Sequence, residues 1–176
     1  FGKPQLPAQV FEFILDRLPA YYEAKGFRVD ELDAVLSLKP GRLLDLDRRL
    51  RAVAGFRDLP EAASLIAANK RIANILKKSD ATPAATVDAA RFVEPAERSL
   101  HAALLQTQPR ADALFDERDY GASLCELAAL KAPVDAFFDG VMVNADDAAL
   151  RANRLALLAA LHAAMNRVAD LSKLAN

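Results

Sequence analysis

Apolar residues recur every three or four positions along nearly the whole chain, and runs of alternating polar and apolar residues are absent. A spacing of three and four residues places side chains on one face of an α-helix, whereas a β-strand needs alternation. Residues branched at the β-carbon, which favour strands, are also sparse. The pattern therefore predicts an all-α fold.

The helices predicted from this pattern are separated by glycine, proline and short polar stretches. They cover about residues 7–22, 30 to before 40, 43–55, 60 to before 79, 95–105, 111–115, 120–129 and 133–138, and a long final helix is capped by Asp146 and runs through Leu171. Residues 79–88 form the clearest loop. In the connector 140–145, we expect the apolar run Val141-Met142-Val143 to be buried.

The predicted helices divide into two unequal parts at a boundary near residues 56–60. Residues 1–58 carry too few apolar side chains to fold alone, whereas residues 59–176 are long enough for a helical bundle around one core. We therefore expect a helical lead-in segment over 1–58, followed by a bundle over 59–176.

Charge is distributed unevenly, although the net charge is only −1. Six basic residues stand against two acidic ones over 39–57, and four stand against one over 61–78. Over 112–126 the balance reverses, with five acidic residues against one basic residue. Such segregation predicts a polar molecule with one basic side. The alternative is that the charges simply coat solvated helix faces.

Cysteine content and hydropathy indicate the cellular setting. The single cysteine, Cys125, excludes an internal disulfide, and its apolar neighbours Leu124 and Leu127 favour a buried, unreactive thiol. No apolar run reaches the ~18 residues of a membrane span, and no signal peptide is visible. We therefore expect a cytoplasmic protein that does not contact a membrane. Because the first residue is not methionine, we also expect a piece of a longer protein.

Catalytic chemistry has no visible basis in the sequence. The two histidines, His101 and His162, lie on separate predicted helices and lack histidine or cysteine partners at metal-ligand spacing. Phosphate-binding glycine loops and nucleophile-elbow motifs are absent. Helix capping explains the pair Asp146-Asp147 better than a metal does, because adjacent helical residues point about 100° apart. We expect no catalytic residue, metal site or cofactor in this chain.

A basic amphipathic segment at 67–78 is the main candidate for binding. Its apolar residues Ile72, Ile75 and Leu76 predict the buried face. Its polar residues form two neighbouring outer stripes: Lys70, Asn74 and Lys77, and beside them Arg71 and Lys78. Lysine and arginine neutralise phosphates, and asparagine pairs with base edges or sugar hydroxyls. The segment is a candidate RNA-binding face, although a basic amphipathic helix alone is a common feature.

Three blocks of the sequence resemble the β subunits of bacterial glycyl-tRNA synthetases. The longest block, at 137–158, contains Phe-Asp-x-Val-Met-Val at 138–143 and Ala-Leu-Arg-x-Asn-Arg-Leu at 149–155. The other blocks are Ala-Asn-Lys-Arg-Ile-x-Asn-Ile-Leu at 68–76 and Phe-Ile-Leu-Asp-Arg-Leu at 13–18. The resemblance is ungapped within each block and extends over nearly the whole chain.

The step Ala149-Leu150-Arg151 is also similar to the motif of DALR-type anticodon-binding domains, with one extra alanine between Asp147 and the step. The resemblance implies a DALR-type helical bundle over 59–176. It also implies that the parent is the β chain of an α2β2 ligase that charges tRNA(Gly) with glycine. ATP and Mg would then bind at the α-subunit site, and this piece would be non-catalytic. The implied partners are the tRNA(Gly) anticodon loop, the α subunit and the remainder of the β subunit.

The resemblance gives the basic segment a specific hypothesis. Glycine tRNAs carry two cytosines in the anticodon, and unstacked anticodon bases expose their edges. The residues expected to contact the loop are Lys70, Arg71, Asn74, Lys77 and Lys78, supported by Arg151 and Arg154. Arg151 has a structural alternative, an ion pair with Asp147 four residues back, and Asn153 is expected to make a packing or capping contact. The alternative function is a helical docking module within a larger assembly.

Overall fold

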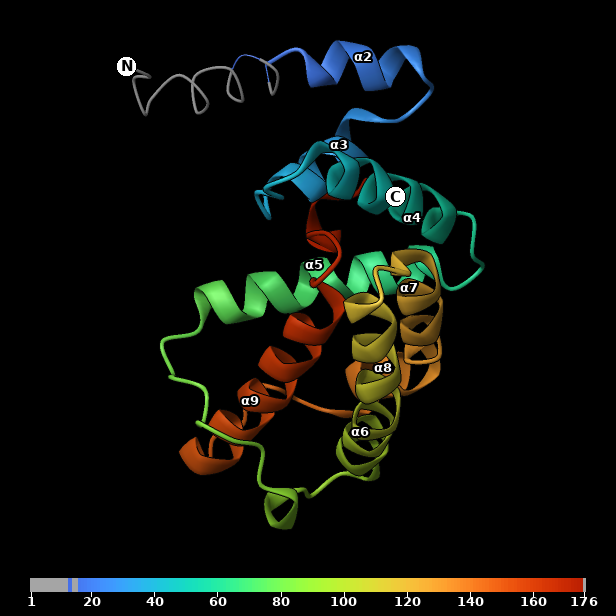
Figure 1. Ribbon diagram of the computed structural model, residues 1–176. Helices are drawn as coiled ribbons and strands as arrows, with labels where there is room; N and C mark the ends of the chain where they lie inside the picture. Colours follow the sequence, from blue (N-terminus) through green and yellow to red (C-terminus); the bar gives the residue numbers. More distant parts are fainter. Residues whose placement is uncertain (1–12, 14–15, 176) are drawn as a thin grey trace, which may run out of the picture.

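The computed structural model describes Phe13 and residues 16–175, and these residues form helices without any β-strand (Figure 1). The elements are α2 (Leu18–Ala24), α3 (Val29–Leu36), α4 (Leu43–Arg57), α5 (Ala62–Lys78), α6 (Pro95–Asp116), α7 (Tyr120–Ala128), α8 (Lys131–Gly140), α9 (Ala148–Met165) and the 3-10 helices η1 (Ala89–Arg91) and η2 (Leu171–Lys173). The predicted all-α class is confirmed for the described residues. Half of the helix predicted over 7–22 lies outside them, and α2 begins within the other half.

Helix α5 crosses the molecule between two groups of helices (Figure 1). On one side lie α2, α3 and α4, and on the other lie α6, α8 and α9, while α7 packs against both α4 and α6. The end of the chain returns to the first group. There the Asp170 amide donates to the Ala34 carbonyl at 2.9 Å, and Arg57 donates to the Ala175 carbonyl at 2.8 Å. The C-terminal segment therefore connects the two groups.

One hydrophobic core runs through both groups and includes residues from Leu18 to Leu174. Its fully buried side chains include Leu50 of α4, Phe137 of α8 and Leu158 of α9. Burying a side chain of this size stabilises the fold by about 1.5–3 kcal/mol. The core is continuous across the predicted boundary between the lead-in segment and the bundle.

Arg49 of α4 joins this helix to the chain that follows α9 through hydrogen bonds. Its guanidinium donates to Asp45 at 2.7 Å and to the carbonyls of Arg167 and Val168 at 2.7 and 2.9 Å. Tyr120 of α7 donates to the same carboxylate of Asp45. Backbone carbonyls beyond the end of a helix need such partners when they are shielded from water. Helix α4 thus contacts α7 and the chain after α9 directly.

Helix α6 is continuous where the sequence predicted two helices, over 95–105 and 111–115. Pro109 lies inside it and has no amide proton, so the carbonyl of Leu105 loses its helical partner. Both residues are exposed, and the freed carbonyl therefore faces water. The predicted break was wrong because a proline on the solvent side of a helix costs less than one facing the core.

Helix α9 ends at Met165, before the predicted end at Leu171. The side chain of Asn166 closes it by donating to the carbonyl of His162 at 2.7 Å and accepting from the Leu171 amide at 2.7 Å. This arrangement satisfies one terminal carbonyl of the helix and turns the chain. The apolar pattern continued past the helix end because the residues after the turn are also buried.

Two residues that were expected to be buried are exposed. Cys125 is exposed, while Leu124 beside it is buried, because adjacent positions of a helix face different directions. In the connector before α9, Val141 is buried and Val143 is partly buried, but Met142 is 76% exposed. A short connector lies against the core on one side only, so it does not bury three consecutive side chains.

Candidate functional site

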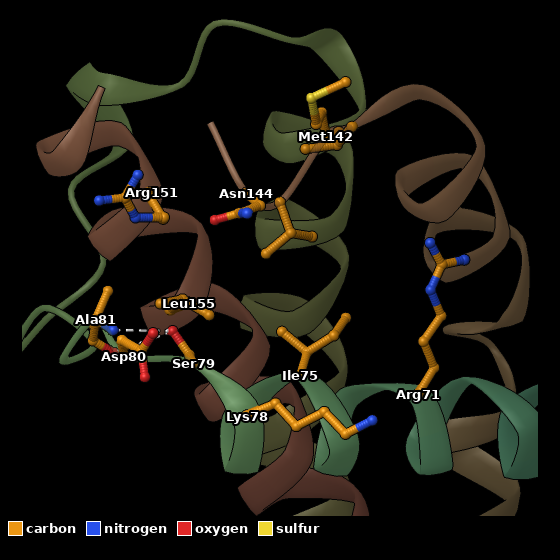
Figure 2. Close-up of a pocket in the computed structure, with 12 residues that line it drawn as sticks. Arg71, Ile75, Lys78, Ser79, Asp80, Ala81, Met142, Asn144, Arg151 and Leu155 are labelled. Atoms are coloured by element: carbon orange, nitrogen blue, oxygen red, sulfur yellow. Dashed lines mark hydrogen bonds between the residues drawn. The ribbon is translucent and has the colours of Figure 1, made fainter. Parts of the chain in front are cut away.

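A groove of about 670 Å³ opens where α5, α9 and two connecting segments meet (Figure 2). Its walls come from the C-terminal half of α5, the segment 79–81 beside α9, the first turns of α9, and the connector 141–144. The lining residues are Arg71, Ile75, Lys78, Ser79, Asp80, Ala81, Val141, Met142, Val143, Asn144, Arg151 and Leu155. Segments that are far apart in the sequence thus form one surface.

The groove is predominantly basic. Its cationic side chains are Arg71, Lys78 and Arg151, and its single carboxylate is Asp80. Arg71 and Lys78 project from the same face of α5, two turns apart, whereas Arg151 projects from α9 (Figure 2). Three cations around one hollow create a positive potential that attracts anions such as phosphate groups.

In the part of the chain that the structure describes, no carboxylate pairs with the three groove cations. The Arg71 guanidinium carbon lies 4.2 Å from the centre of the Phe138 ring, a cation–π arrangement that leaves the charge intact. Within the described residues 16–175, neither Arg71 nor Lys78 nor Arg151 forms an ion pair. These charges are therefore available to a ligand.

Two arginines of α9 hold the connector that forms one wall of the groove. Arg151 donates through Nη1 to the carbonyl of Ala145 at 2.6 Å, and Arg154 donates through Nη1 to the carbonyl of Met142 at 2.7 Å. The connector has no regular secondary structure of its own to satisfy these carbonyls. The two side chains therefore fix the position of the exposed Met142.

Asp147 is the N-cap of α9, a position that was predicted for Asp146. Its carboxylate accepts from the Leu150 amide at 2.8 Å, and this hydrogen bond lowers the pKa of Asp147. Within the described part of the chain, no ion pair joins Asp147 to Arg151. The pairing considered for Arg151 is thus replaced by its hydrogen bond to the connector.

Asn153 of α9 holds the end of the loop 79–88 against this helix. Its side chain is buried, and its Oδ1 accepts from the Asp88 amide at 2.8 Å while its Nδ2 donates to the Asp88 carbonyl at 3.0 Å. Nearby, the Ala84 amide donates to the Ala152 carbonyl at 3.1 Å. These bonds draw the loop 79–88 onto α9. The predicted packing or capping role of Asn153 is confirmed.

Arg154 lies in the core, which corrects its predicted place among the RNA contacts. Its Nε and Nη2 donate to Glu97 at 2.9 and 3.2 Å, and Glu97 and Arg154 are 0% and 5% exposed. Glu97 also accepts from the amides of Val93 and Glu94. Burial raises the pKa of Glu97, but the hydrogen bonds from Arg154 and these amides outweigh burial and lower it. A buried guanidinium with occupied donors does not reach a ligand.

The stripe of α5 that contains Lys70, Asn74 and Lys77 lies beside the groove. Asn74 and Lys77 are exposed and Lys70 is partly buried, and none of them lines the groove. Their spacing places them on the face of α5 next to the face of Arg71 and Lys78. Of the seven predicted contact residues, the structure brings three together in the groove.

The groove also contains residues that the sequence had not singled out. Asp80 follows α5, and Met142 and Asn144 belong to the connector before α9. Asp80 stood in a stretch identified only as a loop, and Met142 was expected to be buried. The position of Asp80 directly after a basic helix could have marked it as a candidate binding residue. The connector that faces it across the groove is set by tertiary packing.

A family model described as DALR anticodon binding domain matches residues 65–173, a range that contains both sides of the groove. The chain belongs to the DALR anticodon binding domain family. The DALR match begins within α5 and ends at η2. The region recognised as DALR therefore includes the helices α6 to α9 and most of α5.

The chain is also similar to glycine–tRNA ligase beta subunits of several bacteria. It is 62% identical over 166 residues to the protein of Leptothrix cholodnii, which covers 94% of this chain and 23% of that protein. The protein of Methylobacillus flagellatus is 60% identical over 94% of this chain and 23% of its own length. The protein of Delftia acidovorans is 58% identical over 95% of this chain and 24% of its own length. This chain spans about a quarter of the length of these curated relatives.

The described residues contain no helix with the length and apolar character that crossing a bilayer requires. Among the same described residues, histidine, cysteine and carboxylate side chains do not gather in groups of three or more that fit a metal ion. His101 instead packs against the Phe92 ring, with ring centres 5.3 Å apart.

Proposed function

We propose that this chain binds the anticodon loop of tRNA(Gly) as part of the β subunit of a glycine–tRNA ligase, and so supports the ATP-dependent charging of that tRNA with glycine. The basic groove between α5 and α9 carries the proposal, because it lies within the part of the chain that matches the DALR anticodon binding domain. The similarity to glycine–tRNA ligase beta subunits supports the choice of glycine tRNA.

A single-stranded RNA loop suits a groove of this kind. Phosphates are attracted to Arg71, Lys78 and Arg151, and unstacked bases present flat faces to apolar side chains and edges to polar ones. A volume of about 670 Å³ lies in the range of sites that enclose small organic ligands. The groove therefore accommodates an unstacked nucleotide together with its phosphates.

The groove residues take different parts in this proposal. Arg71, Lys78 and Arg151 contact the backbone of the loop inside the groove. The neighbouring stripe extends the basic surface along α5 and contacts the flanking phosphates: Lys70, Asn74 and Lys77. Arg154 acts only through the connector whose carbonyl it holds, because its own donors are occupied.

The proposal extends to the whole protein. The α subunit would bind ATP and Mg²⁺ and activate glycine, within an α2β2 assembly in the cytoplasm. Residues 59–176 would form the anticodon-binding domain, and residues 1–58 the lead-in segment. The hydrogen bonds of Arg49 to the chain after α9 support a lead-in segment that packs on the domain and orients it against the remainder of the β subunit.

The test is a titration with tRNA(Gly) and with the same tRNA mutated at its two anticodon cytosines, each at two salt concentrations. We expect tighter binding of the intact anticodon and a marked loss of affinity at higher salt, because counterions are released from the phosphates. Equal affinity for both tRNAs would reduce the interaction to phosphate attraction and overturn anticodon recognition.

A docking role is the second candidate, and exposed leucines favour it. Leu38, Leu43 and Leu44 lie around the turn between α3 and α4 and are 38%, 39% and 62% exposed. Exposed apolar side chains gathered in one place are typical of interaction surfaces. Absence of tRNA binding, combined with loss of subunit assembly on Leu44→Ser substitution, would favour docking over RNA binding.

A further inference from the structure

The groove holds one carboxylate among its cations, and this carboxylate has no partner within the described residues. Asp80 is exposed and lines the groove directly after α5. Its neighbours bond to each other, since the Ser79 hydroxyl donates to the Ala81 carbonyl and accepts from the Ala81 amide, both at 3.2 Å. No hydrogen bond or ion pair within residues 16–175 uses the Asp80 carboxylate. A hydrogen-bond acceptor is thus left open towards the groove.

Two other acidic residues of the same segments, Asp88 and Asp147, have structural partners. Asp88, at the end of the loop, accepts from the Ala90 amide at 3.0 Å, and Asp147 accepts from the Leu150 amide at 2.8 Å. Their carboxylates stabilise local turns and helix ends. Asp80 makes no such bond among the described residues, so its carboxylate is free to serve a ligand.

Met142 supplies an apolar surface on another side of the groove. Its side chain is 76% exposed, although its neighbour Val141 is buried, and its carbonyl is held by Arg154 at 2.7 Å. Figure 2 shows Met142 on the side of the groove opposite Ile75, with Asp80 nearer to α9. Thioethers pack well against the faces and edges of planar rings. The groove therefore offers a ring-packing side chain at one end and a hydrogen-bond acceptor at the other.

We propose that Asp80 is a specificity-determining residue that accepts a hydrogen bond from the 4-amino group of an unstacked cytosine, while Met142, at the other end of the groove, packs against the ring of a neighbouring base. This inference rests on the proposed function. Glycine codons begin with two guanines, so their anticodons carry two cytosines. An ionised carboxylate only accepts hydrogen bonds, and it suits the N4 amino group of cytosine but repels the O4 oxygen of uracil.

The experiment uses the full-length β subunit assembled with its α subunit. The Kd of tRNA(Gly) and kcat/KM of aminoacylation are measured for the natural anticodon and for anticodons with either cytosine replaced by uridine. The variants are Asp80→Asn and a matched control, Glu117→Gln, which removes an exposed acid at the turn after α6 and outside the groove. A third variant, Lys78→Gln, tests the cationic groove itself.

We expect Asp80→Asn to reduce the preference for cytosine at one anticodon position by about tenfold, because an amide also donates to uracil O4. Glu117→Gln leaves the preference unchanged, and Lys78→Gln weakens all tRNAs alike. If Asp80→Asn keeps the full preference for cytosine while Lys78→Gln weakens binding, the specificity role of Asp80 is overturned and the groove remains the tRNA site. No effect of either variant would overturn the groove as the tRNA site as well. An equal change for all anticodons in Asp80→Asn would assign Asp80 to charge balance and also overturn base recognition.

Discussion

The Arg154 guanidinium and the Glu97 carboxylate form a two-pronged ion pair in the core, and the same arginine holds the Met142 carbonyl at the wall of the groove. Glu97 in turn accepts from the backbone at the start of α6. One buried pair therefore joins α6, α9 and the connector between α8 and α9. The Ala-Leu-Arg-x-Asn-Arg-Leu stretch, which resembles known synthetases, thus organises the groove from within.

Substitution of Arg154 by methionine should destabilise the protein severely. Removing one partner leaves the Glu97 charge buried without compensation, which costs about 3–5 kcal/mol in comparable pairs. Urea denaturation at neutral pH measures this loss. Arg51→Met is the control, because its pair with Asp47 is largely exposed and solvent screening leaves such a pair little effect on stability. Similar losses in the two variants would refute the importance of the buried pair.

The stability of the Glu97–Arg154 pair should depend on pH in the acidic range. The pKa of Glu97 in the folded state is lowered from its ordinary value of 4.5. The stabilisation by the ionised carboxylate is therefore complete above about pH 4.5 and is lost as the pH falls through the folded-state pKa. The free energy of unfolding, compared between the wild type and Glu97→Gln, should differ at pH 7 and converge as the pH falls below 4.5. A difference that stays constant would contradict this assignment.

Asn153→Ala should release the loop 79–88 from α9. The variant removes both hydrogen bonds to Asp88, and leaving buried backbone groups unpaired costs about 1–3 kcal/mol. Hydrogen exchange should show loss of protection at the amides of Asp88 and Ala84. Asn144→Ala, a change at an exposed asparagine of the connector, provides the control. Unchanged protection at Asp88 in Asn153→Ala would contradict the role of this side chain in holding the loop.

The two polar stripes of α5 should differ in their effect on tRNA binding. A variant with Arg71→Gln and Lys78→Gln removes two groove charges and should flatten the salt dependence by about 1.4 in log Kd per log salt, since each contact to a single strand contributes about 0.7. The matched variant, Lys70→Gln with Lys77→Gln, removes two charges from the neighbouring face and should flatten it less. A larger effect of the second variant would move the binding surface out of the groove.

The sequence predicted most helices because burial on one face of a helix imposes a regular spacing of apolar residues. Helices α4, α5 and α7 begin and end close to their predicted bounds. The prediction of a break in α6 failed because the effect of Pro109 on a helix depends on whether the proline faces solvent or the core. For Arg154 a signal was present, since it lies four residues after Leu150 and three before Leu157, on the apolar stripe. A charged residue at such a position indicates a buried ion pair.

By itself, the sequence determined the helical class, the basic face of α5 and the resemblance to anticodon-binding domains, because each depends on residues that are close together in the chain. Only the tertiary structure decided that Arg71, Lys78 and Arg151 share a groove, that Asp80 and Met142 belong to it, and that Arg154 does not. These relationships join α5 to the connector before α9, and helix packing sets the distance between them. Local periodicity shows which face of each helix is buried, but it does not show which other helix covers that face.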